Sequence, residues 1–491
     1  MLKDLAKARM PEPEDLDALR ESEQAKLAAS QTKLKEAGLP VLVMLEGWGA
    51  AGKGETLRRV IRNLDPRFYI VKTMRPPAKE EKRYPFLRRY LLDIPEAGRF
   101  TFYDTFWMDE IVNGRMSGKL SDEAYEQRVR SVNTMERQLT DNGYLVMKFF
   151  FHIGQEEQRK RIRKLQKNKD TKWRVSLEDL FENEHYGKYR KAYDRYLADT
   201  ERASAPWYII DAEDAKWAEL QVLLFLNQGI DTALKNHALA APIRQNIFPL
   251  EPIPALADIP LNKSLPEDGY KEELDALQKE LGELHDRIYR RKIPVIIAYE
   301  GWDAAGKGGN IKRIARAMDP RGYVVEPIAS PEPHEKARHY LWRFWKRLPK
   351  DGHITIFDRT WYGRVMVERI EGFCSENDWQ RAYNEINEFE KELYDWGAVI
   401  LKFWVQIDSD TQLQRFNERQ ETPEKQWKIT EEDWRNREKW PAYEEAVNEM
   451  LQKTNTSFAP WHILESNDKR YARVKALRIV VEALRKACGE D

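Results

Sequence analysis

A phosphate loop is the clearest chemical feature of this sequence. The segment 301–307 reads GWDAAGK, which has the GxxxxGK spacing of a P-loop. It follows an apolar run and precedes a helical pattern, which is the context that the motif requires. Backbone N–H groups at the start of the helix would surround phosphate oxygens, and the lysine would bridge them. The residues expected to contact phosphate here are Gly301, Ala304, Ala305, Gly306, Lys307 and Gly308.

Two carboxylates are placed to hold a metal ion beside this loop. Gly308 stands where P-loop proteins usually carry the Ser or Thr whose hydroxyl binds Mg²⁺. A magnesium–phosphate complex still needs oxygen ligands. Asp303 lies inside the loop, and Asp358 ends a strand-like run at 354–358, so each can supply a carboxylate. We therefore predict a Mg²⁺ site formed by Asp303 and Asp358.

Two arginines follow the second carboxylate in the segment 358–364, which reads DRTWYGR. Arg359 and Arg364 could pair with phosphate bidentately and stabilise the charge that develops during phosphoryl transfer. Surface ion pairing is the alternative for both side chains. The predicted catalytic residues are therefore Asp303, Lys307, Asp358, Arg359 and Arg364.

The segment 412–434 is polar, basic in its first part and interrupted by Pro423. It lies where P-loop kinases carry a mobile lid, and its cations could close on phosphates and exclude water. A solvated helix face is the alternative for each of them. The lid residues predicted to contact phosphate are Arg415, Arg419, Lys425 and Lys428.

The whole pattern occurs twice. The sequence EGWGAAGKGE at 46–55 recurs as EGWDAAGKGG at 300–309, with a constant offset (301 − 47 = 254). Because the same offset relates Asp104 to Asp358, we predict two copies of one globular fold. The predicted organisation is a first domain over 1–238, a proline-rich linker over 239–266 and a second domain over 267–491.

Strand-like and helical segments alternate in each repeat. In the second repeat the strand-like runs are 294–300, 323–327, 354–358, 398–407 and 461–465. This order predicts an α/β fold in which a parallel sheet lies between helices.

The first repeat lacks several of the chemical groups. The residues corresponding to Asp303, Arg359, Tyr362, Gly363 and Arg364 are Gly49, Thr105, Met108, Asp109 and Glu110. Loss of one charge-stabilising group typically costs about 10²–10³ in rate. We therefore predict that the first domain is catalytically inactive or very weak. Its basic segment 158–174 could guide a polyanion, with a solvated charged helix as the alternative.

Composition narrows the partners and the compartment. Lys and Arg (82) balance Asp and Glu (82), so no global charge favours nucleic acid or a membrane surface. The two cysteines have no metal-ligand spacing, no apolar run is long enough to span a bilayer, and the N-terminal segment lacks a signal-peptide pattern. We expect a cytoplasmic protein with neither nucleic acid nor membrane as partner.

These motifs together resemble the type-2 polyphosphate kinase family, and the similarity covers nearly the whole chain. The segments that carry it are 301–309, 358–364, 422–434 and 455–464. The resemblance implies a three-layer αβα fold with a helical lid, and Mg²⁺-dependent phosphoryl transfer between inorganic polyphosphate and a nucleotide. It also implies Asp303 and Asp358 at the metals, Lys307 on phosphate, and the two arginines on polyphosphate or the transferred group.

The tandem arrangement is similar to the class that phosphorylates nucleoside monophosphates, which implies AMP as acceptor and ADP as product. Three alternatives stay open: transfer to ADP giving ATP, an ATP-dependent kinase of a nucleotide or metabolite, and a regulator that binds without turnover. The family also implies a homo-oligomer. The nucleotide base is expected to contact the lid and the segment 330–343.

Overall fold

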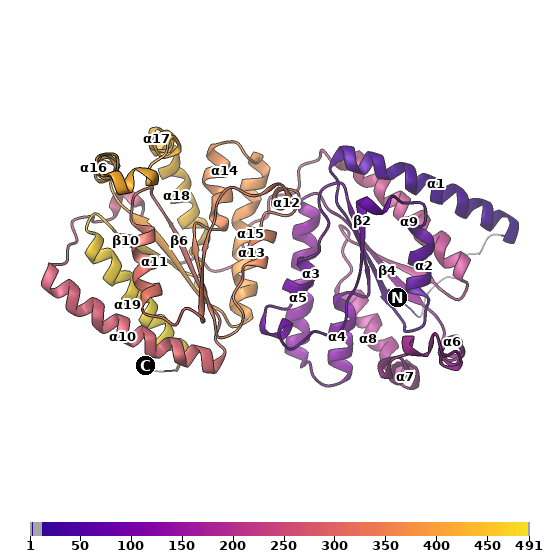
Figure 1. Ribbon diagram of the computed structural model, residues 1–491. Helices are drawn as coiled ribbons and strands as arrows, with labels where there is room; N and C mark the ends of the chain where they lie inside the picture. The colour runs from indigo at the N-terminus through magenta and orange to yellow at the C-terminus, as the bar shows by residue number, and fades with distance from the viewer. Residues whose placement is uncertain (1, 3–11, 490–491) are drawn as a thin grey trace. The chain divides into compact units, whose positions relative to one another are not determined.

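The computed structural model describes residues 2 and 12–489 (Figure 1). Each repeat contains a five-stranded sheet, with strand order β2-β3-β1-β4-β5 in the first and β7-β8-β6-β9-β10 in the second. Every strand pair is parallel, and helices cover both faces of each sheet. The predicted α/β class and the parallel sheets are therefore confirmed.

The elements of the first repeat follow in chain order. They are α1 (Pro13–Ala37), β1 (Val41–Gly47), α2 (Lys53–Val60), β2 (Tyr69–Thr73), α3 (Arg88–Leu91), β3 (Phe100–Asp104), α4 (Trp107–Met116), α5 (Asp122–Asp141), β4 (Leu145–His152), α6 (Gln155–Lys167), α7 (Leu177–Glu184), α8 (Tyr186–Asp199), β5 (Trp207–Asp211) and α9 (Ala215–Asn236).

The second repeat has the same succession of strands. Its elements are α10 (Glu267–Arg291), β6 (Val295–Gly301), α11 (Lys307–Arg316), β7 (Tyr323–Pro327), α12 (Pro333–Lys336), α13 (Trp342–Lys346), β8 (Ile354–Asp358), α14 (Val367–Ile370), α15 (Glu376–Asp395), β9 (Val399–Gln406), α16 (Ser409–Glu421), α17 (Glu431–Glu438), α18 (Trp440–Thr454), β10 (Trp461–Glu465) and α19 (Lys469–Ala487).

The central strands explain why the phosphate loop lies at a sheet edge. The first six residues of β6 are buried, as expected for a parallel strand covered by helices on both faces. The register pairs Tyr299 with Asp358 of β8, and Gly301 with Val405 of β9. The carboxyl ends of the three strands therefore meet at one edge, where open α/β sheets bind ligands.

The chain divides into two compact units. The first consists mainly of the first repeat and also contains Pro333–His339, and the second consists mainly of the second repeat and also contains Lys79–Arg88. Between the repeats, residues 239–266 contain one short 3₁₀ turn (Leu256–Asp258) and are otherwise irregular, apart from an isolated bridge of Leu250 to Thr456. Across residues 2 and 12–489, every helix is too short or too polar to cross a membrane.

Candidate active site

The phosphate loop joins β6 to α11 in a conformation that few residues permit. An added Cβ at Gly301 would lie 2.6 Å from the carbonyl oxygen of Val405 in the neighbouring strand, so only glycine fits there. Ala304 and Gly306 both have positive φ (61° and 115°). The ammonium of Lys307 donates to the carbonyl oxygen of Gly301 at 2.6 Å, which folds this side chain back over the loop.

Arg415 of α16 donates hydrogen bonds to main-chain oxygens of the phosphate loop. Its Nη1 donates to the carbonyl oxygens of Ala304 and Ala305 at 3.0 Å, and its Nη2 donates to those of Ser466 (2.6 Å) and Asn467 (3.1 Å). The side chain is buried. Both terminal nitrogens are thus held by main-chain oxygens, and the predicted contact of Arg415 with phosphate stays a prediction. The guanidinium ties the phosphate loop to the segment after β10.

Asp303 connects the phosphate loop to the lid helices. Its Oδ2 accepts a hydrogen bond from the Asn436 amide of α17 at 3.1 Å, and its Oδ1 lies 3.5 Å from Nη2 of Arg359. Gln412 of α16 donates to the Asp303 carbonyl oxygen at 3.0 Å. Side chains of both α16 and α17 therefore contact this one residue.

The second predicted carboxylate, Asp358, ends β8 beside the same sheet edge. Next to the loop, an added Cβ at Gly308 would meet no atom within 4 Å, so there is room for a ligand where other P-loops carry a hydroxyl. Asp303 lines the cleft and Asp358 does not. A carboxylate beside open space suits Mg²⁺, which usually takes one or two carboxylates together with phosphate oxygens of the substrate. In the described chain, no group of three or more metal-ligating side chains occurs. A bound ion would thus depend on the substrate phosphates.

A buried carboxylate that the sequence analysis did not select fixes the position of Arg359. Glu300 accepts hydrogen bonds from the backbone N–H (2.7 Å) and the hydroxyl (2.8 Å) of Thr360. Burial raises the pKa of Glu300. Arg359 itself has a positive φ of 67°, which is uncommon for a residue with a side chain. The recurrence of Glu46 and Glu300 before each phosphate loop was the available signal.

The other predicted cations are distributed differently. Arg364 pairs with Glu368 at 3.0 Å and lies over the ring of Tyr340, and it does not line the cleft that contains Asp303 and Arg359. Arg419 is partly exposed in the last turn of α16. The side chains of Lys425 and Lys428 lie outside the described part of the structure.

Aromatic and apolar side chains form the remaining wall of this cleft. Trp302 stacks on Trp440, the first residue of α18, with ring centroids 3.7 Å apart and planes 8° from parallel. Tyr443 and Met366 also line the cleft. Its lining residues in the described chain include Gln412 and Glu432 of the lid segment and lie outside 330–343, and the contacts of the nucleotide base stay a prediction.

Comparison with known proteins decides the family. The model of the family polyphosphate kinase 2 (PPK2) matches residues 12–238 and 264–490. The chain belongs to the polyphosphate kinase 2 family. It is 42% identical over 480 residues to a polyphosphate:AMP phosphotransferase of Pseudomonas syringae pv. tomato and 40% identical over 481 residues to one of Pseudomonas aeruginosa, with 96% of each chain covered. A crystal structure of a protein named as a polyphosphate kinase 2 from P. aeruginosa PA01 matches with a TM-score of 0.87, 37% identity and complete coverage of both chains.

In the first repeat of this family member, acidic side chains of α7 lie against the equivalent part of the phosphate loop. Gly49 replaces the loop aspartate, and its N–H donates to Oε2 of Glu182 at 2.8 Å. Glu182 belongs to α7 and corresponds to Asn436. An added Cβ at Gly49 would lie 2.0 Å from Oδ1 of Asp179, so a side chain here would require Asp179 to move. Burial raises the pKa of Glu182 to about 7.

Proposed function

We propose that this chain transfers a phosphoryl group from inorganic polyphosphate to AMP, giving ADP, and that the second repeat alone performs the reaction. One observation carries this proposal: Asp303, Lys307 and Arg359 line a single cleft, whereas the first repeat has lost the aspartate and the arginine. The two relatives that match the chain over 96% of its length are both named as AMP phosphotransferases.

The reaction joins two polyanions, so the site must lower the repulsion between them. A phosphate oxygen of AMP forms a bond to the terminal phosphorus of polyphosphate, while the bridging oxygen leaves with the shortened chain. Lys307 and Arg359 offset the charge of the phosphates, and the helix N-terminus at Lys307 supplies main-chain donors. Bound Mg²⁺ would add further neutralisation of phosphate charge. No side chain needs to form a covalent intermediate.

Asp303 would orient the acceptor phosphate or the metal, because it lies in the phosphate loop and lines the cleft. The contacts from Asn436 and Gln412 limit the movement of this residue, and an oriented carboxylate requires less rearrangement during transfer. The aromatic pair Trp302 and Trp440 gives the same cleft a flat apolar surface, which suits a nucleobase.

The Mg²⁺ requirement, a homo-oligomeric state and a cytoplasmic location stay predictions, as does the absence of nucleic-acid and membrane partners. The domain boundaries at 238 and 267 also stay predictions. Phosphate contacts by Arg364, Arg415, Arg419, Lys425 and Lys428 also stay predictions.

The test is to incubate the protein with Mg²⁺, AMP and long-chain polyphosphate without ATP, and to quantify nucleotides by chromatography. ADP as the main early product supports the proposal. ATP formed only when ADP is supplied would move the acceptor to a nucleoside diphosphate. Transfer that occurs only with ATP as donor would contradict the proposal.

A further inference from the structure

A group of cations lies beside the phosphate loop of the second repeat but outside the cleft. It consists of Lys469 and Arg473 in the first turns of α19 and Arg313 on α11. An added Cβ at Gly309 would be 3.3 Å from Nη2 of Arg473 and 3.8 Å from Nη1 of Arg313. Both guanidinium groups therefore border the first turn of the helix that begins at the phosphate-binding lysine. We call Lys469, Arg473 and Arg313 the α19 cation cluster.

The charge of this cluster is not neutralised within the described chain. None of its three cations has a carboxylate within ion-pair distance there. Arg313 donates instead to the hydroxyl of Tyr270 (3.2 Å) and to the carbonyl oxygen of Gly309 (3.0 Å).

The pKa of Lys469 is lowered first by burial and then by neighbouring positive charges, among them those of Arg415 and Arg473. Glu418 of α16 is the carboxylate that acts on it in the opposite direction. Cations held together in partly buried positions repel one another, so this arrangement does not stabilise the fold. It does provide a place for an anion.

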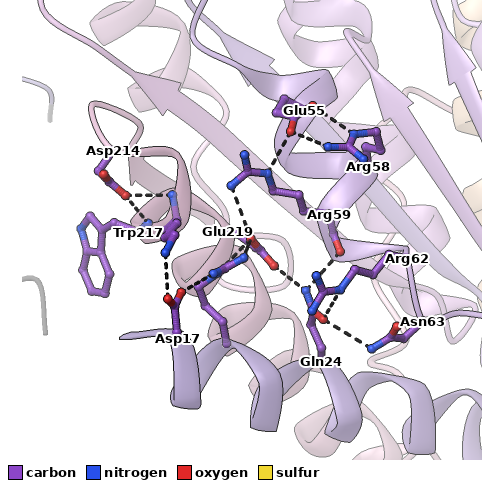
Figure 2. A network of polar contacts seen from close by, with 12 residues as sticks. Asp17, Gln24, Glu55, Arg58, Arg59, Arg62, Asn63, Asp214, Trp217 and Glu219 are labelled. Atoms are coloured by element: carbon purple, nitrogen blue, oxygen red, sulfur yellow. Dashed lines mark hydrogen bonds and ion pairs between the residues drawn. The ribbon is translucent and has the colours of Figure 1, made fainter. Parts of the chain in front are cut away.

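In the first repeat, acidic side chains neutralise the arginines at the equivalent positions (Figure 2). At the position of Arg473 it has Glu219, whose carboxylate is fully buried and accepts from Nε of Arg20 at 2.9 Å. Arg59, which corresponds to Arg313, lies 3.9 Å from the same carboxylate. At the position of Gly309 it has Glu55, which accepts from Nε of Arg59 at 2.9 Å.

Two acids of the first repeat are thus replaced by an arginine and a glycine in the second. Lys469 adds a further cation, since its counterpart is Ala215. The exchange leaves positive charge and open space beside the phosphate loop of the repeat that retains the catalytic residues. Helix packing alone does not explain it, because α2 and α9 of the first repeat contact each other with the acids in place.

We propose that the α19 cation cluster is a second anion subsite, which binds phosphates of the donor chain beyond those held by the phosphate loop. The proposal rests on the proposed function, because it takes a linear polyphosphate as its ligand. The short separation between the cluster and the first turn of α11 lets one continuous chain contact both. Guanidinium and ammonium groups suit this ligand, because each offers several charged donors to phosphate oxygens.

The subsite has a specific consequence for donor length. We expect the three phosphates of tripolyphosphate to be held mainly by the phosphate loop, so its use should depend little on Arg473. Long polyphosphate should gain affinity from the additional contacts. A charged hydrogen bond contributes about 1.5–3 kcal/mol, which corresponds to roughly a tenfold or larger change in affinity.

The test compares Arg473→Glu with the wild type at saturating AMP, using long-chain polyphosphate and tripolyphosphate as donors. The variant should fold, because the first repeat carries glutamate at this position beside an arginine. We expect KM for long polyphosphate to rise by about tenfold or more, with KM for tripolyphosphate and for AMP unchanged. Lys469→Ala should give a smaller shift in the same direction. Arg290→Glu on α10 makes the same change of charge at an exposed position and should change none of these constants.

The outcomes separate the subsite from the proposed function. The subsite proposal is refuted if the wild type makes ADP and Arg473→Glu changes KM for both donors equally, or for neither. If the wild type makes no ADP from polyphosphate, the proposed function fails, and calorimetric titration of wild type and variant with long polyphosphate then tests the subsite alone. Equal binding by the two proteins would overturn it. Binding of inorganic phosphate with no dependence on chain length would show a site for a single phosphate only, and would also overturn it.

Discussion

The two repeats keep one backbone and differ in where a carboxylate stands. In the second repeat an aspartate lies in the phosphate loop, and an amide from α17 donates to it. In the first repeat the loop residue is Gly49, and the carboxylate is supplied by Glu182 from the equivalent helix. In both repeats a polar side chain of this helix contacts the phosphate loop, but the carboxylate has changed sides. The comparison teaches that one P-loop fold can carry different side chains at the position of the loop aspartate, and we propose that the first repeat is inactive for this reason.

The two repeats share the same backbone conformation at the positions around the phosphate loop. Ala50 and Ala304 both have positive φ (57° and 61°), as do Thr105 and Arg359 (72° and 67°). These strained conformations persist in the first repeat although the arginine has been lost. They therefore belong to the architecture of the sheet edge, and the side chains that stand on it decide function.

Replacing the loop aspartate of the second repeat should have the largest effect on activity. Asp303→Asn removes a charge but keeps the shape, so we expect kcat to fall by about 10²–10³ with the structure intact. The matched variant is Glu182→Gln in the first repeat, which should leave kcat unchanged. Steady-state ADP formation measures both. A wild-type rate for Asp303→Asn would refute the catalytic role of this residue.

The amide that orients the aspartate should have the next largest effect. Asn436→Asp places a second carboxylate beside Asp303, so repulsion replaces a hydrogen bond. We expect activity to fall by about 10–100-fold, as is typical for groups that hold a metal-binding residue in place. Asn436→Gln should recover part of the loss if the amide acts by positioning. The dependence of rate on Mg²⁺ concentration is the readout, since a purely structural defect would leave it unaltered.

The aromatic pair should affect nucleotide affinity more than rate. Trp440→Ala removes the ring that stacks on Trp302, and we expect KM for AMP to rise by about tenfold. Trp440→Tyr should restore most of the affinity, because the first repeat stacks Tyr186 on Trp48 with centroids 3.9 Å apart. An unchanged KM for AMP in the alanine variant would place the base elsewhere.

The smallest expected effect concerns the stability of the first unit. The pKa of Glu182 is raised from 4.5 to about 7, so the folded state holds a proton that the unfolded state has lost. Stability should therefore fall as pH rises from about 4.5 to 7 and remain low above that. Glu182→Gln should stabilise this unit by about 1–3 kcal/mol at pH 8 and have little effect at pH 4.5.

Hydrogen exchange of peptides from α7 would measure this difference, and Glu184→Gln, an exposed neighbour, serves as its control. Equal protection of wild type and Glu182→Gln at pH 8 would show that burial of the charge does not weaken the unit.

The sequence was sufficient for the features that depend on local order. The strand–loop–helix context of the phosphate loop and the constant offset between repeats predicted the parallel sheets and their duplication, because both are written in short segments. Arg415 shows the limit. Its position in a basic lid segment predicts a phosphate contact. Its hydrogen bonds to the carbonyl oxygens of Ala304 and Ser466 could not be predicted, because these residues are more than fifty positions away and meet Arg415 only on folding.

The lid side of the site was not predictable for a similar reason. Asn436 and Trp440 belong to a polar stretch without a recognised motif, and their role depends on how α17 and α18 approach the loop. The paired repeats did contain a signal, since Glu182 stands at the position of Asn436 while Gly49 stands at that of Asp303. The two substitutions can be recognised as linked only when it is known that these side chains touch in the fold.

The central claim is that only the second repeat transfers phosphate. The most direct test changes the phosphate-loop lysine of each repeat separately, as Lys53→Met and Lys307→Met, and measures ADP formed from polyphosphate and AMP. We predict that Lys307→Met abolishes ADP formation and that Lys53→Met retains the wild-type rate. Loss of ADP formation in Lys53→Met, with Lys307→Met still active, would contradict the account.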